Sequence, residues 1–186
     1  MEQDELLVTI ASILAKLEIP YAVTGGIAIS VWGHPRFTAD IDIAVELLSE
    51  KLDQLAKELL TIDKDVYVDE TMMRRALARK GEFNFIHPAS GLKVDFWILK
   101  NDLFSKTEMK RRVDKKISGT TVSFISPEDL ILRKLLWYKV TESTRQLEDI
   151  KTVFERQKKL DMKYIKKWAK MHSTDTILEK LLKGVS

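Results

Sequence analysis

The chain has 186 residues, of which 45% are hydrophobic and 32% are charged, with 7 Gly and 4 Pro. This composition is typical of a soluble globular protein and excludes disordered and fibrous chains. The absence of Cys excludes disulfides and thiolate metal sites. The N-terminus has no signal-peptide pattern, and no apolar run approaches the roughly 20 residues of a membrane span. We therefore expect a cytoplasmic protein with no membrane partner.

Charge is distributed unevenly along the chain. Residues 1–60 contain four Lys and Arg against ten Asp and Glu, whereas residues 151–186 contain ten Lys and Arg against four Asp and Glu. Part of the basic end is a run at mostly helical spacing: Lys159, Lys163, Lys166, Lys167 and Lys170, with Trp168 among them. Such a stripe suits the phosphates of RNA. The alternative, which we favour for this stripe, is a solvated helix face.

The first half of the chain alternates helices and strands. Apolar periodicity predicts a helix over 2–18, stopped by Pro20, and then a strand over 21–24. Gly25 and Gly26 form a turn into a helix over 27–31. A loop over 34–39 leads to a strand over 40–46. Ser49 is predicted to be the N-cap of a helix over 50–60.

The second half passes from strands to helices. We predict a short strand over 65–69, a helix over 70–80, and strands over 82–87 and 92–99 joined by a turn at 88–91. Residues 101–116 are ambiguous, and a strand is predicted over 120–125. Ser126 and Pro127 have the positions of an N-cap and a first helical residue, for a helix to about 139. Helical segments follow near 143–157, 161–171 and 174–183.

These elements predict an α+β fold with a small mixed sheet flanked by helices and a C-terminal helical segment. The expected domains are an α/β core over 1–125 and a helical region over 126–186 that packs on the core.

Two carboxylates lie one residue apart in the predicted strand over 40–46. Side chains at i and i+2 of a strand share a face, so Asp40 and Asp42 project together while Ile41 and Ile43 face the core. Two such charges repel unless a cation lies between them, and Mg²⁺ binds carboxylate and phosphate oxygens. The alternative is a solvent-exposed strand face, which for Asp-x-Asp alone is the commoner case.

A third carboxylate, Asp95, lies in the apolar strand over 92–99. Val94 and Phe96 alternate with it, so Asp95 points to one face. If this strand is the neighbour of the first, the three acids converge on one metal site. A charge inside an apolar strand needs a partner or a function. The alternative partner is Lys93 or a distant Arg.

The glycine pair Gly25-Gly26 joins a strand to a helix. Missing Cβ atoms let a ligand approach the backbone, and N–H groups at a helix start attract phosphate oxygens. No Gly-Lys-Ser/Thr follows, so the pattern differs from a Walker A loop.

Together these motifs resemble the nucleotidyltransferase superfamily with the DNA polymerase β-like core. They are Gly25-Gly26-x-Ala28, Arg36-x-Thr38-x-Asp40-Ile41-Asp42 and Val94-Asp95. A second set of motifs is similar to the AbiEii/AbiGii-type toxins. It consists of the run from Ser126 to Leu135, then Arg145, and then Glu148-Asp149-Ile150.

The resemblance implies a nucleotidyltransferase core over 1–125, an NTP substrate and a Mg²⁺ or Mn²⁺ cofactor. It implies that Asp40, Asp42 and Asp95 are metal ligands and catalytic residues, with Asp95 also a candidate general base. Gly25 and Gly26 would receive the β and γ phosphates. The nucleotide-binding set would be completed by Arg36, Thr38, Lys134 and Asp149. For Lys134 the alternative is an exposed helix cation, and for Asp149 a surface salt-bridge set with Arg145 and Glu148.

The first functional hypothesis is transfer of a nucleoside monophosphate from an NTP to an acceptor, which is RNA or tRNA, a protein or a small molecule. The second is a non-catalytic nucleotide-binding module or the toxin of a toxin–antitoxin pair, with an antitoxin partner. A glycosyltransferase using Asp-x-Asp is a third and weaker alternative, because the glycine turn lies upstream.

Overall fold

The computed structural model of the protein describes residues 1–184, which form two compact units. The first unit contains residues 1–27 and 37–125, and the second contains residues 28–36 and 126–184. None of the helices in the described residues has the length and apolar character needed to cross a membrane. The predicted packing of the helical region on the α/β core stays a prediction.

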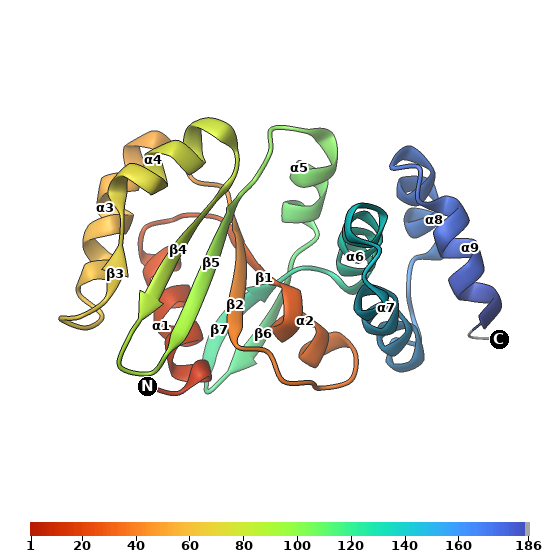
Figure 1. The fold of residues 1–186 in the computed structure, drawn as a ribbon, viewed down its shortest axis with the longest axis horizontal. Helices are drawn as coiled ribbons and strands as arrows, with labels where there is room; N and C mark the ends of the chain where they lie inside the picture. Colours follow the sequence, from red (N-terminus) through yellow and green to blue (C-terminus); the bar gives the residue numbers. More distant parts are fainter. Residues whose placement is uncertain (185–186) are drawn as a thin grey trace. The chain divides into compact units, whose positions relative to one another are not determined.

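The first unit is built on a seven-stranded mixed sheet with the order β3-β4-β5-β2-β1-β7-β6 (Figure 1). Two neighbouring pairs, β2 with β5 and β1 with β7, are parallel, and the remaining pairs are antiparallel. The strands are β1 (Tyr21–Thr24), β2 (Asp40–Val45), β3 (Tyr67–Val68), β4 (Glu82–His87), β5 (Leu92–Ile98), β6 (Val113–Ile117) and β7 (Thr120–Phe124). The predicted mixed sheet is thus confirmed.

One face of the central strands is apolar. Ile41, Ile43, Val94 and Phe96 have no exposed surface. The unit also contains α1 (Gln3–Lys16), α3 (Ser49–Leu60), α4 (Glu70–Arg79) and α5 (Leu103–Lys110). Helix α1 contacts both α3 and β7, and Figure 1 shows α1 behind the strands. Because alternate residues of a strand face opposite ways, the side chains between the buried ones form a second, polar face.

One local prediction needs correction, and one ambiguous stretch is resolved. Ser49 is not an N-cap, since the chain is extended at Leu48 and the helix begins at Ser49 itself, without a side-chain cap. The ambiguous stretch 101–116 holds helix α5, whose N-cap Asp102 accepts a hydrogen bond from the Ser105 N–H, and most of strand β6. The capping carboxylate gives this short helix a defined start.

The second unit is helical. Helix α2 (Gly25–Trp32) begins in the first unit and continues into the second. The others are α6 (Pro127–Thr141), α7 (Thr144–Arg156), α8 (Met162–Met171) and α9 (Asp175–Gly184). Ser126 caps α6 and Pro127 opens it, as predicted, and the Ser126 hydroxyl accepts from the Asp129 N–H. The buried Asp129 also accepts a 2.6 Å hydrogen bond from the Tyr164 hydroxyl, which ties α8 to the start of α6.

Candidate active site

On the polar face of the sheet, register partners on neighbouring central strands form rows across the sheet, and each such row is a rung. Asp42 of β2 is the register partner of Asp95 on β5 and of Thr24 on β1, and Asp95 is the partner of Asn84 on β4. One rung away, Asp40 is the partner of Lys93. Register partners share a face, so the three acids lie on the same side of the sheet. The sequence predicts this only on condition that the two strands are neighbours, and they are.

The glycine turn lies against this face. Gly25 has φ +61°, and a Cβ built on it would overlap the carboxylate of Asp42. A Cβ on Gly26 would overlap the Thr38 side chain. Both glycines are therefore required by close approach, and the first also by its backbone conformation. The structure thus brings four of the predicted residues together where β1 passes into α2.

Each buried or half-buried acid of the face has a partner. Asp95 accepts a hydrogen bond from the Asn84 amide, and its other oxygen lies 2.8 Å from the Lys93 ammonium. Asp42 accepts a 3.3 Å hydrogen bond from the Trp97 indole N–H. Asp40 lies 3.8 Å from the Lys93 ammonium. The ion pair with Lys93, which the sequence offers as the alternative for Asp95, is therefore present alongside the convergence of the acids.

The face contains a further carboxylate that the sequence reasoning missed. Glu82 of β4 is the register partner of Trp97 and so shares the face of Asp95. Partial burial, and then the negative charges of Asp95 and Asp42, raise the pKa of the Glu82 carboxyl above its usual range. Asn84 and Trp97 were also missed. The alternation Glu82-Phe83-Asn84-Phe85, polar against apolar, is the signal that marks two of these residues.

Carboxylate oxygens on adjacent strands beside a glycine turn are the donor type that Mg²⁺ takes, so the residues fit such an ion chemically. As they stand, however, no three His, Cys, Asp or Glu side chains within residues 1–184 are arranged to coordinate a metal. Lys93 supplies the positive charge among the acids. Its hydrogen bond to Asp95, together with the charges of Asp95, Asp40 and Asp42, raises the pKa of the Lys93 ammonium, so it stays protonated.

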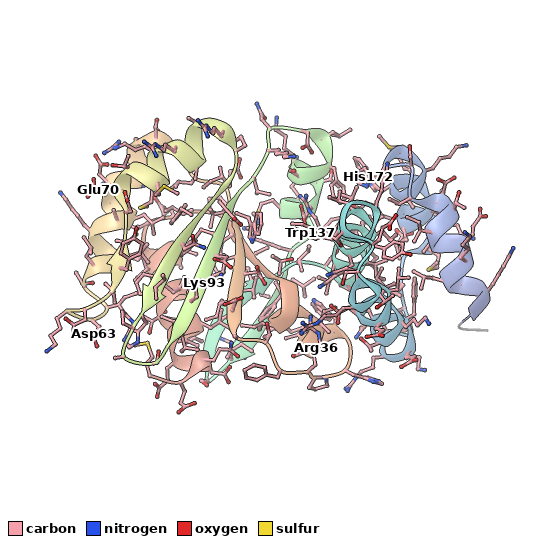
Figure 2. The ribbon with its side chains drawn as sticks, in the orientation of Figure 1. Arg36, Asp63, Glu70, Lys93, Trp137 and His172 are labelled. Carbon is pink, nitrogen blue, oxygen red and sulfur yellow. The ribbon has the colours of Figure 1, made fainter. Side chains whose placement is uncertain are left out.

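The other predicted nucleotide-binding residues form a cluster in the second unit. Arg36, labelled in Figure 2, donates two hydrogen bonds to Asp149, of 2.7 and 2.9 Å. The Lys134 ammonium lies 2.8 Å from the same carboxylate. The side chains of Lys134 and Asp149 are only 9% and 3% exposed. Lys134 is therefore not an exposed helix cation, and Asp149 is not part of a surface salt-bridge set.

Opposing effects set the charge state of Asp149. Burial favours the neutral acid, but the hydrogen bonds and charges of Arg36 and Lys134 outweigh it and lower the pKa of the Asp149 carboxyl. Close packing is also found near this cluster, since Gly33 lies so near Thr152 of α7 that a Cβ on the glycine would overlap the threonine side chain. The Gln157 amide adds a 2.6 Å hydrogen bond to the Trp32 carbonyl.

The basic stripe lies on and just before α8. Lys159, Lys163, Lys166, Lys167 and Lys170 are all exposed, while Ile165 and Trp168 on the same helix are buried. This is the solvated face that the sequence favours, and its contact with RNA stays a prediction.

Comparison with solved structures identifies the fold. An antigenic nucleotidyltransferase-like protein from Paracoccidioides brasiliensis is similar with a TM-score of 0.55 and 18% identity, over 97% of this chain and 91% of that one. ANT(2")-Ia, in complex with adenylyl-2"-tobramycin, has a TM-score of 0.61 and 16% identity, over 92% and 97%. The lincosamide antibiotic adenylyltransferase LnuA, lincomycin-bound, has a TM-score of 0.54 and 12% identity, over 84% and 98%. No curated protein matches the sequence.

The chain thus has a nucleotidyltransferase fold, the class that the sequence motifs indicate. The match to a family is more specific. Residues 10–176 match the family described as nucleotidyl transferase AbiEii toxin, type IV toxin–antitoxin system. The chain belongs to this family and is a nucleotidyltransferase.

Proposed function

We propose that the protein transfers a nucleoside monophosphate from an NTP to a nucleophilic group of an acceptor, with Mg²⁺ or Mn²⁺ as cofactor. The observation that carries this proposal is the rung that joins Asp42 to Asp95, directly against the glycine turn that opens α2. This pairing places two carboxylates on one face of the sheet, beside the start of a helix. The N–H groups at a helix start also attract phosphate oxygens.

The metal ions would be held by Asp40, Asp42 and Asp95. Bound there, they would supply positive charge to the phosphates and to the departing pyrophosphate. Asn84 and Trp97 would orient two of the carboxylates through the hydrogen bonds that they donate. Asp95, buried beside Asn84, is proposed to receive the proton of the acceptor hydroxyl.

The nucleotide phosphates would contact the N–H groups of Gly25 and Gly26 at the start of α2. Thr38 lies against Gly26 and its carbonyl accepts a 3.0 Å hydrogen bond from the Gln3 amide, so the loop around it is held in place. Arg36 and Lys134, in the second unit, are proposed to be nucleotide-binding residues, as the resemblance implies. Asp149 would hold these two cations in fixed orientations, because its carboxylate bonds both.

Transfer is tested by incubating the protein with each of the four α-³²P-labelled NTPs, Mg²⁺ and a panel of acceptors. The panel contains tRNA, the protein itself, and the aminoglycoside and lincosamide compounds suggested by the neighbours with adenylylated or bound antibiotics. The expected result is label on one acceptor class that requires both metal and Asp42. Absence of transfer to every acceptor, together with absence of metal-dependent NTP binding, would contradict the proposal.

Family membership favours a second proposal, that this enzyme is the toxin of a toxin–antitoxin pair. Its expected signature is growth arrest on induced expression, relieved by co-expression of a neighbouring reading frame. The matched control is Asp42→Asn, expressed at the same level. Arrest by that variant would show that toxicity is independent of nucleotidyl transfer, and absence of arrest by the wild-type protein would count against a toxin.

A further inference from the structure

One cation lies within the acidic face of the sheet. The Lys93 ammonium is 2.8 Å from Asp95 Oδ2 and 3.8 Å from Asp40 Oδ1. Figure 2 labels Lys93 on β5, the strand that also carries Asp95. A single ammonium thus bridges carboxylates that belong to two different strands.

The register explains why this lysine reaches both acids. Lys93 lies two residues before Asp95, so the two side chains share a face, and it is the direct partner of Asp40 across β2 and β5. The Lys93 side chain is 36% exposed, whereas that of Asp95 is 10% exposed. The lysine is thus much more exposed than the acid with which it pairs, so its side chain already has access to solvent.

We propose that Lys93 is an internal counter-cation of this face, which a divalent ion must displace from Asp95 in order to bind. This inference rests on the proposed function, because it takes Asp40, Asp42 and Asp95 to be the metal ligands. In the metal-free protein, Lys93 offsets repulsion between the acids and keeps the buried Asp95 paired. The same ion pair lowers metal affinity, since one ligand oxygen is released only when the ammonium leaves.

Two consequences with opposite signs follow. Removal of the ammonium strengthens metal binding, because the divalent ion then neither competes with the Lys93 ammonium for Asp95 nor is repelled by it. Removal also destabilises the metal-free protein, because Asp95 stays buried without its cation. A lysine with only a packing role would produce neither the gain in affinity nor a stability defect that metal repairs.

The test is Mn²⁺ binding measured by the loss of the free-ion EPR signal during titration of the wild type, Lys93→Met and Asp42→Asn. Lys93→Gln, which keeps a hydrogen-bond donor, is a second variant in case the methionine variant does not fold. Lys64→Met is the control, because this substitution changes the net charge by the same amount. Lys64 lies on a turn and pairs only weakly with the exposed Asp65. We expect about tenfold tighter Mn²⁺ binding for either Lys93 variant and no change for Lys64→Met.

Thermal unfolding with and without Mn²⁺ provides the second readout. Lys93→Met and Lys93→Gln should melt below the wild type in EDTA, and this difference should disappear or reverse at saturating Mn²⁺. Binding that depends on Asp42 but is unchanged or weaker in both Lys93 variants overturns the inference and leaves the proposed function intact. Mn²⁺ binding that is the same with and without Asp42 overturns both.

Discussion

Two charge clusters of this protein have opposite compositions. On the sheet face, one ammonium is shared by acids, whereas in the helical unit one carboxylate, Asp149, is enclosed by two cations, Arg36 and Lys134. The Asp149 side chain is 3% exposed, but that of Asp40 is 47% exposed. The enclosed cluster has its charges matched by its own side chains. The open one has more acids than cations and is suited to exchange its cation, which is why we assign the chemistry to it.

The largest expected effect is on catalysis at the open cluster. Asp42→Asn should reduce transfer about 10³-fold, because the loss of one carboxylate ligand removes several kcal/mol of charge stabilisation at the metal. Single-turnover transfer of labelled nucleotide measures the effect. Asp65→Asn, on an exposed turn, serves as the control and should retain wild-type activity. More than a tenth of wild-type activity in Asp42→Asn would contradict the assignment of the chemistry to the sheet face.

At the enclosed cluster the main expected effect is on stability. Asp149→Asn leaves Arg36 and Lys134 without their common anion and should cost about 3 kcal/mol, as the loss of one partner from a buried ion pair does. Urea unfolding measures this cost. Glu148→Gln, at the exposed neighbouring position on α7, should stay within about 0.5 kcal/mol of the wild type. Equal effects of the two substitutions would contradict the enclosed geometry.

The same carboxylate predicts a pH dependence. The folded-state pKa of Asp149 lies below the ordinary value of 3.8, so its stabilisation is complete above that value and is lost as pH falls through the lowered pKa. The stability difference between wild type and Asp149→Asn should therefore be constant from pH 7 to 5 and shrink below about pH 4. Unfolding at a series of pH values checks this. A difference that grows on acidification would show that the pKa is raised instead.

A smaller change in stability is expected at the glycine turn, where two substitutions distinguish backbone strain from close approach of the side chain of Asp42. Gly25→Ala combines a positive φ with an overlap on Asp42, whereas Gly91→Ala combines φ +69° with open space. Gly91→Ala should cost about 1 kcal/mol from strain alone. Gly25→Ala should cost at least about 1 kcal/mol more and also weaken NTP binding. Equal stability losses and unchanged NTP binding would mean that the contact with Asp42 is unimportant.

Local patterns were sufficient for much of the fold and for part of the site. Alternation placed Asp40 and Asp42 on one face, and capping residues placed the start of α6. Strand β6 was missed because its central residues are polar, and it was recognised only through its pairing with β7. An edge strand of this kind lacks the apolar alternation on which sequence prediction depends.

Long-range pairing is what the sequence could not supply. The register that joins Asp42 to Asp95, and Asp40 to Lys93, depends on two strands separated by about fifty residues. Glu82 and Asn84 reach the same face only through the pairing of β4 with β5. Trp97 lies two residues after Asp95 on β5 and shares its face by alternation. Likewise Asp149 looked like one of several surface charges on α7, and only the tertiary fold shows that Arg36 and Lys134 enclose it.

We propose that the carboxylates of the sheet face and the glycine turn together hold an NTP through divalent metal. The decisive experiment is equilibrium binding of a labelled non-hydrolysable NTP, with Mg²⁺ or with EDTA, to the wild type and to the variant with Asp40, Asp42 and Asp95 all changed to Asn. We expect nucleotide binding that requires Mg²⁺ in the wild type and is absent from the triple variant. Nucleotide binding of equal strength in EDTA, or undiminished in the triple variant, would contradict it.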